Sequence, residues 1–168
     1  EAGNAELVAA LAGTTHLLHS IPPGPEGDPV LRLYRAEIAG LPTLDWIGYL
    51  STVGVYGSSA GAVVDESAQP PPRSDPTRAR VVSESGWLAL GEEIGRPAQV
   101  FRLAGIYGPG RSAFDKLRAG KARRIVKPGQ VFDRIHVEDI ASVLEASIAR
   151  PRASAIYNVA DDEPAPPG

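Results

Sequence analysis

The sequence has no cysteine, which excludes disulfide bonds, thiolate catalysis and cysteine-based metal sites. Methionine is also absent and the chain opens at Glu1, so we expect that it is not an intact translation product. No apolar run approaches the roughly 18 to 20 residues that span a bilayer, and no basic start precedes an apolar core of the signal-peptide type. These absences predict a cytoplasmic protein without a membrane partner.

A large charge of either sign is missing as well. The formal net charge of −3 gives no reason to expect nucleic acid or an anionic membrane surface as a partner. His16 and His19 lie in one predicted strand, where they face opposite sides and cannot share a metal ion. The acidic run 161–163 supplies too few converging oxygens for magnesium or calcium, and we interpret it as a solvated turn. We therefore expect no metal site.

Apolar stretches alternate with loops along 168 residues, a length that suits one domain. Helical patterns cover residues 4–11, 30–39, 77–90, 112–119 and 138–150, and strand patterns cover 14–21, 44–52, 98–106 and 156–159. Asn4 is the expected N-cap of the first helix, and Gly91 is expected to follow the end of the third. Strands that alternate with helices predict an α/β domain with a parallel sheet.

The segment from Trp46 to Gly57 reads W-I-G-Y-L-S-T-V-G-V-Y-G, a buried strand that ends in a small-residue turn. Apolar residues dominate without polar alternation, as in a parallel strand that is covered on both faces. Ligands of open parallel sheets bind beyond the carboxyl ends of the strands. The hydroxyls of Ser51 and Thr52 are therefore candidates for contact with a substrate or cofactor, or alternatively satisfy only local backbone groups.

Other polar residues have a simpler interpretation. The basic residues of 118–127 either attract an anionic substrate or form a solvated surface; they are Arg118, Lys121, Arg123, Arg124 and Lys127. His136 precedes a predicted helix, and we expect it to hydrogen-bond a loop carbonyl. No Walker A loop, H-E-x-x-H motif or G-x-G-x-x-G motif occurs. The last of these belongs to the first strand–helix turn of a dinucleotide-binding fold, and the strands of this chain read as later ones.

Four segments carry a family resemblance by their order and spacing. They are S-T-V-G-V-Y-G (51–57), F-R-L-A-G-I-Y-G-P-G (101–110), R-I-H-V-E-D-I-A (134–141) and Y-N-V-A-D-D-E-P (157–164). With them the chain resembles the extended short-chain dehydrogenase/reductases, also called the NAD-dependent epimerase/dehydratase family. The resemblance covers nearly the whole chain but only the middle and later part of the family fold. It implies a partial Rossmann-like, doubly wound parallel sheet of the later strands with C-terminal substrate-side elements.

The resemblance also implies roles for individual residues. Thr52 matches the family's active-site Ser/Thr, whose hydroxyl binds a substrate oxygen, and Ser51 matches the small polar residue before it. The turn that begins Ser20, Ile21 and Pro22 matches the loop along the nicotinamide ribose. The loop packed beside the nicotinamide is matched by Leu103, Ala104, Gly105 and Ile106.

The chain departs from the family at the catalytic Tyr-x-x-x-Lys pair. Alignment of R-V-V-S-E (80–84) on the family's K-x-x-x-E places Arg80 at the lysine position and Pro76 at the tyrosine position. Arg80 could bind a ribose hydroxyl or phosphate but cannot tune an absent proton donor. Tyr56 or Tyr107 could replace the tyrosine, or each could simply fill core space. The chain in this respect resembles the family's atypical subgroup.

The function that the resemblance implies is that of an NAD(P)-dependent oxidoreductase or epimerase/dehydratase with a non-standard active site, acting on a small-molecule substrate. The alternative is a catalytically weak or inactive NAD(P)-binding sensor or assembly protein. Residues 1–168 are expected to form a single partial NAD(P)-binding domain, with substrate-side elements mainly in 108–137 and 157–168. NAD or NADP is the expected cofactor, and a homodimer is possible.

The strand expected at 14–21 would normally lie beside the first strand of the family's domain. Its open edge carries Leu17, Leu18 and Ile21. An uncovered apolar edge invites pairing with another chain. We therefore expect residues 1–168 alone to be oligomeric or aggregation-prone in light scattering, and expect the native chain to carry the missing N-terminal portion. A monodisperse monomer that melts cooperatively would contradict this expectation.

Overall fold

The fold is an α/β sandwich seen here in a computed structural model, which describes residues 5–57, 62–71, 74–121 and 131–164. Asn4, Arg123, Arg124 and Lys127 lie outside the described residues. The helices are α1 (Ala5–Leu11), α2 (Pro29–Ala39), α3 (Asp75–Ile94), α4 (Ala113–Arg118) and α5 (Val137–Ala149), with a 3₁₀ turn η1 (Val53–Tyr56). The strands are β1 (His16–His19), β2 (Trp46–Thr52), β3 (Ala98–Leu103), β4 (Gly105–Tyr107), β5 (Arg134–His136) and β6 (Ala155–Val159).

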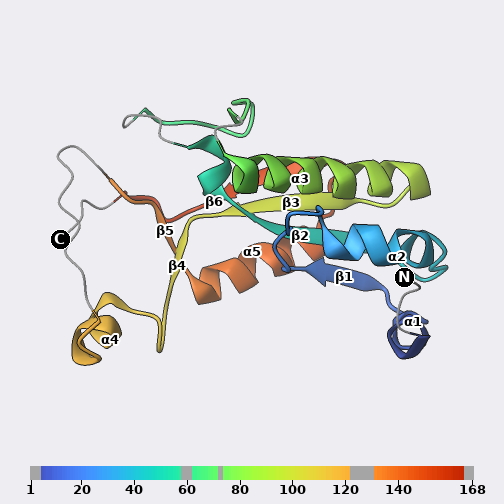
Figure 1. Ribbon diagram of the computed structural model, residues 1–168, viewed down its shortest axis with the longest axis horizontal. Helices are drawn as coiled ribbons and strands as arrows, with labels where there is room; N and C mark the ends of the chain where they lie inside the picture. The colour runs from blue at the N-terminus through green and yellow to red at the C-terminus, as the bar shows by residue number, and fades with distance from the viewer. Residues whose placement is uncertain (1–4, 58–61, 72–73, 122–130, 165–168) are drawn as a thin grey trace.

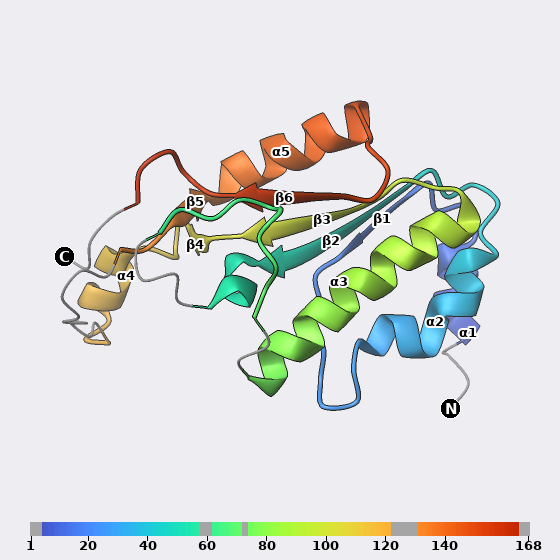
Figure 2. The ribbon, with the colours of Figure 1, turned by 90° about the horizontal axis from the view of Figure 1, so that it is seen from above.

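A four-stranded sheet of order β1-β2-β3-β6 forms the centre, and all of its neighbouring strands are parallel. Helices α2 and α3 cover one face and α5 covers the other (Figures 1 and 2). Helices on both faces of a parallel sheet are the doubly wound arrangement. The α/β class and the Rossmann-like sheet expected from the sequence are therefore confirmed.

The strand predicted over 98–106 is wrong in one respect, because it divides after Leu103. Ala104 N still donates to Val159 O of β6, but Gly105 N donates to Asp133 O. From there β4 pairs with β5 in a separate two-stranded sheet. The sequence did not predict β5, since three residues directly before a helix give too short a pattern.

Helix α3 is longer than the predicted segment 77–90, and the expected stop at Gly91 is wrong. The helix continues to Ile94 and ends at Gly95, which has φ +66°, the left-handed conformation that glycine adopts without strain. Gly91 lies inside the helix because α3 passes close to β3. A Cβ at Gly91 would lie 2.4 Å from the Cβ of Ala98. The small residue here serves packing rather than termination.

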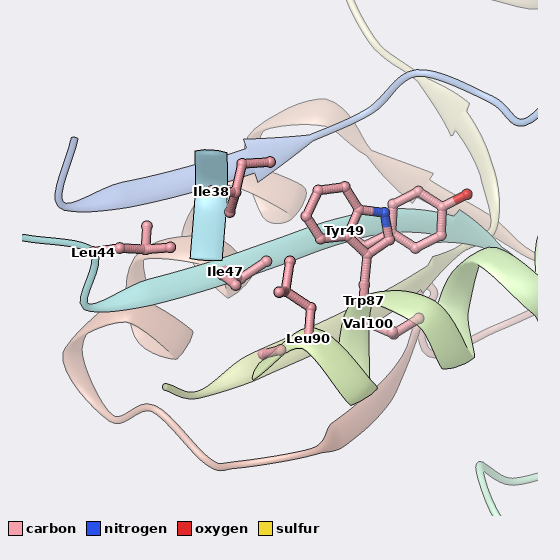
Figure 3. Close-up of a cluster of buried hydrophobic side chains, with 8 residues drawn as sticks. Ile38, Leu44, Ile47, Tyr49, Trp87, Leu90 and Val100 are labelled. Atoms are coloured by element: carbon pink, nitrogen blue, oxygen red, sulfur yellow. The ribbon is translucent and has the colours of Figure 1, made fainter. Parts of the chain in front are cut away.

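Two apolar clusters hold the helices to the sheet. The cluster under α2 and α3 is drawn in Figure 3 and includes Ile38, Leu44, Ile47, Tyr49, Trp87, Leu90, Ala98 and Val100. The cluster under α5 contains Trp46, Phe101, Leu103, Ala104, Ile135, Ile140 and Val159. Strand β2 contributes side chains to both clusters. Trp46 faces α5, whereas Ile47 and Tyr49 face α3, because successive side chains of a strand point to opposite faces.

Strand β1 is the outer strand of the described sheet on the side away from β6. Leu18 and Ile21 along and just beyond it are 50% and 51% exposed. This is the apolar edge expected from the sequence, although its pairing with a second chain stays a prediction. Among the described helices, none is long and apolar enough to cross a membrane.

Candidate functional site

The candidate site lies along the carboxyl edge of the four-stranded sheet. Parallel strands end at the same edge, so the segments after β1, β2, β3 and β6 come together there (Figure 2). Thr52 pairs with Leu103 in the ladder at this edge. Ser20, Ile21 and Pro22 follow β1 and are exposed. The parallel topology therefore places Thr52, Leu103 and the turn 20–22 along the same edge of the sheet.

Thr52 is the last residue of β2 and the N-cap of η1. Its Oγ1 accepts a hydrogen bond from Gly54 N at 3.1 Å. The side chain is half-buried, and the hydroxyl proton has no acceptor among the residues that the structure describes. The local backbone contact and a substrate contact are thus compatible, since a hydroxyl can accept one bond and donate another.

Ser51 points to the opposite face of β2, into the protein. It is 5% exposed, and its hydroxyl donates to Glu84 Oε1 at 2.5 Å. A buried serine whose proton is used by a carboxylate does not present that proton at the edge. Ser51 anchors the end of β2 to α3, and its predicted role beside the cofactor stays a prediction.

Glu84 also forms a buried ion pair with Arg102 of β3. Arg102 Nη2 lies 2.7 Å from Glu84 Oε2, and Arg102 Nε lies 3.2 and 3.3 Å from the two carboxylate oxygens. The two side chains are only 4% and 3% exposed. Burial lowers the pKa of Arg102, but the hydrogen bonds and charge of Glu84 raise it, and the net pKa lies above its ordinary value. Arg102 therefore stays protonated inside the protein.

Tyr56 completes the same network from η1. Its hydroxyl accepts from Arg102 Nη1 at 2.6 Å and donates to Asn158 Oδ1 at 2.9 Å. The guanidinium carbon of Arg102 also lies 4.8 Å from the centre of the Tyr56 ring. The residue is 7% exposed. Both hydrogen-bonding functions of the Tyr56 hydroxyl are therefore engaged within the protein.

The network ties the edge of β6 to the loop before α3. Asn158 N donates to Glu66 Oε1 at 2.7 Å, so a loop carboxylate satisfies a backbone amide of the outer strand. Sequence reasoning did not single out Arg102 or Asn158. The available signal was a polar residue inside each apolar strand, R in F-R-L and N in Y-N-V, since a buried charge or amide requires partners.

Helix α3 begins at the carboxyl edge and runs back across the sheet (Figure 2). Pro76 is exposed in its first turn, where a proline is tolerated because the first amides lack intrahelical partners. Arg80 follows one turn later and is half-buried. The position aligned with the family tyrosine thus holds a residue without a proton to transfer.

Tyr107 lies in β4 and takes no part in the hydrogen-bonded network around Arg102. It is 36% exposed, and its ring meets that of His136 edge-on at 5.1 Å. A hydrogen bond to Asp161 raises the pKa of Tyr107 above its ordinary value. This shift opposes proton transfer near neutral pH, for which a lowered tyrosine pKa is needed.

The remaining predicted site residues are dispersed. Leu103 and Ala104 are buried at the end of β3, whereas Gly105 and Ile106 have left the central sheet with β4. His136 accepts a 3.4 Å bond from Glu138 N as the N-cap of α5, rather than donating to a loop carbonyl as expected. His16 lies near Trp46 and His19 near Tyr49, on opposite sheet faces. Within the described ranges, no three His, Asp or Glu residues gather as metal ligands.

Comparison with known proteins agrees with this architecture. A model of the NAD dependent epimerase/dehydratase family matches residues 33–160. Protein YeeZ of Escherichia coli K12 is 31% identical over 113 residues, which are 66% of this chain and 38% of YeeZ. A functionally unknown conserved protein from Silicibacter pomeroyi has a structure with TM-score 0.86 and 55% identity, covering 94% of this chain and 55% of that one.

UDP-glucuronic acid 4-epimerase from Bacillus cereus in complex with NAD is similar in fold, with TM-score 0.75 and 21% identity over 96% of this chain and 59% of the epimerase. The chain thus spans between 38% and 59% of the length of these relatives. The family model, by contrast, matches more than half of the chain. The matched residues 33–160 include three strands of the central sheet and the helices α3 and α5 on its two faces. The chain belongs to the NAD dependent epimerase/dehydratase family.

Proposed function

We propose that this chain forms the catalytic edge of an NAD(P)-dependent oxidoreductase or epimerase/dehydratase with a non-standard active site. The observation that supports it most directly is Thr52, whose hydroxyl sits at the carboxyl edge with its proton unused among the described residues. In this role Thr52 donates to an oxygen of a small-molecule substrate. Its backbone contact with Gly54 N fixes the hydroxyl before substrate arrives.

We place the nicotinamide half of a dinucleotide beside Thr52. Exposed Ile21 offers apolar surface for a planar ring, and half-buried Arg80 offers a cation for ribose or phosphate oxygens. Ser20 and Pro22 flank the ribose in this arrangement, with Leu103, Ala104, Gly105 and Ile106 beside the ring; Ser51 acts by anchoring the strand end. A bound cofactor would supply hydride transfer, while the protein supplies orientation and polar contacts.

The alternative is an NAD(P)-binding sensor or assembly protein with little turnover. Three observations favour it. Pro76 cannot transfer a proton, the Tyr56 hydroxyl is engaged by Arg102 and Asn158, and the pKa of Tyr107 is raised. Loss of one acid/base group typically costs about 10²- to 10⁴-fold in rate, so it does not abolish catalysis. A turnover assay of the intact protein over a panel of hydroxyl- and keto-substrates separates the two functions.

The 168-residue chain by itself is expected to bind neither NADH nor NADPH with useful affinity. The Gly-rich turn that holds the cofactor pyrophosphate on backbone amides has no counterpart in the sequence. Titration followed by nicotinamide fluorescence tests this, with the intact protein as the binding control. Micromolar binding by the 168-residue chain would contradict the placement of the pyrophosphate site outside these residues.

We propose that the substrate side comprises mainly 108–137 and 157–168, of which 122–130 and 165–168 lie outside the described residues. Helix α4 lies at the end of the molecule toward which the parallel strands point (Figure 1). The cytoplasmic location and a homodimer remain predictions from the sequence.

A further inference from the structure

Tyr49 carries a polar atom that the fold leaves without a partner. The residue is fully buried at 0% exposure, and its hydroxyl makes no hydrogen bond in the described protein. A buried hydroxyl without a hydrogen-bond partner is destabilising, whereas phenylalanine would fill the same space without that loss. Such a group calls for an explanation beyond packing.

The ring of Tyr49 is held firmly. It stacks on His19 at 5.3 Å and on Trp87 at 6.4 Å between ring centres. His19 Nε2 and Trp87 Nε1 lie 3.2 and 3.0 Å from the same carboxylate oxygen of Asp28, which joins the two rings. Figure 3 shows the Tyr49 ring beside Trp87, with its hydroxyl pointing along β2 toward the end of the strand. The phenol is therefore a rigid group directed toward the candidate site.

Arg80 lies on the face of α3 that covers this phenol. Residues 80, 83, 84 and 87 follow helical spacing, and the last three are buried against the sheet. Trp87 stacks on Tyr49 and Glu84 accepts from Ser51, so α3 runs antiparallel to β2. Arg80 is one turn closer to the carboxyl edge than Glu84. Burial raises the pKa of Tyr49, and the neighbouring Arg80 and Ser83 partly oppose that shift.

We propose that Tyr49 is a positioning residue whose hydroxyl accepts a hydrogen bond from the Arg80 guanidinium when Arg80 engages a ribose hydroxyl or phosphate oxygen of the cofactor. The inference rests on the proposed dinucleotide function. The stacked phenol is already rigid, so only the arginine loses rotamer freedom when the bond forms on cofactor binding, which limits the entropy lost on association. The Tyr49 hydroxyl gains its missing partner in the same step.

The test is a double-mutant cycle in the intact protein, with NADH and NADPH titrated by fluorescence. Arg80→Ala should weaken binding of the preferred cofactor by about 10- to 100-fold, and Tyr49→Phe by about 10-fold, the scale of one hydrogen bond to a charged group. In the Arg80→Ala background, Tyr49→Phe should have no further effect. The melting temperature of Tyr49→Phe should not fall, because the hydroxyl has no partner in the free protein. If Tyr49 had a purely structural role, Tyr49→Phe would lower both the cofactor affinity and the melting temperature, or neither of them.

Tyr34→Phe is the matched control, since Tyr34 of α2 packs against the same apolar cluster but lies in no segment assigned to cofactor or substrate, and it should leave cofactor affinity unchanged. Wild-type affinity in Tyr49→Phe, together with weakened binding in Arg80→Ala, would overturn the inference and leave the cofactor function standing. Additive effects of the two substitutions would overturn it as well. An intact protein that binds neither nucleotide would overturn the proposed function itself, and the role of Tyr49 with it.

Discussion

Arg102→Ala is expected to lower the free energy of unfolding by about 3–5 kcal/mol, the cost of leaving a buried charge without its partner. The substitution leaves the Glu84 carboxylate buried with only Ser51 as a donor, and it removes the donor to Tyr56. For a domain of this size, the melting temperature should fall by roughly 10 °C. Urea unfolding of the intact protein measures the free energy directly.

Arg35→Ala is the control for this stability prediction. Arg35 of α2 forms an ion pair with Glu93 of α3 at 2.6 Å, but the two side chains are 38% and 57% exposed. Exposed pairs contribute at most about 1 kcal/mol, so this variant should unfold almost like the wild type. Combining Arg102→Met with Glu84→Leu should recover part of the loss, because both charges are then removed. A loss below about 1 kcal/mol in Arg102→Ala would contradict the interpretation of the network as a buried structural pair.

If the proposed activity is correct, Thr52→Val is expected to reduce turnover of the intact protein by about 10- to 1,000-fold, the scale of one lost hydrogen bond in the transition state. The swap keeps the branched shape of the side chain but removes the hydroxyl. It also removes the acceptor for Gly54 N, for which we expect a stability loss of about 1 kcal/mol. Measuring kcat/KM beside the unfolding free energy separates these two effects.

Thr52→Ser should restore most of the turnover, since serine returns the hydroxyl at the same strand end. Tyr56→Phe and Tyr107→Phe, assayed in parallel, ask whether either tyrosine replaces the absent family tyrosine. Because Tyr56 bonds Arg102 and Asn158, its variant should lose stability as well as any activity. Unchanged kcat/KM in Thr52→Val on an identified substrate would reduce Thr52 to a turn residue.

Much of the fold follows from local pattern. The buried strand at 46–52 lies within the predicted 44–52, and the helix at 29–39 lies within one residue of the predicted 30–39. The departures have tertiary causes. Gly91 resembles a helix stop in sequence but is required by the close approach of α3 to Ala98. The strand after β3 divides because Asp133 O takes the amide of Gly105, a partner 28 residues away.

The geometry of the candidate site was predictable only where it is built from consecutive residues, and the functional roles of its residues stay predictions. Thr52 can be placed at the end of its strand from the sequence, because the apolar pattern of neighbouring residues shows where the strand ends and which face each side chain takes. Its neighbour Ser51 carries the same kind of hydroxyl, yet it faces inward and bonds Glu84, 33 residues further on. No local signal distinguishes the two hydroxyls except the strand's alternation, which places them on opposite faces.

The sequence by itself determined the α/β class, the parallel sheet, the position of Thr52 and the absence of the Tyr–Lys pair, because each depends on short-range periodicity or on residue identity. Only the tertiary structure decided that Arg102 is neutralised by Glu84, that Tyr56 is engaged on both sides and that the Tyr49 hydroxyl has no partner. These partners lie 18 to 102 residues apart in the chain. Burial withdraws polar atoms from water, so the partner that each finds, or lacks, depends on which groups the packing of distant elements brings near.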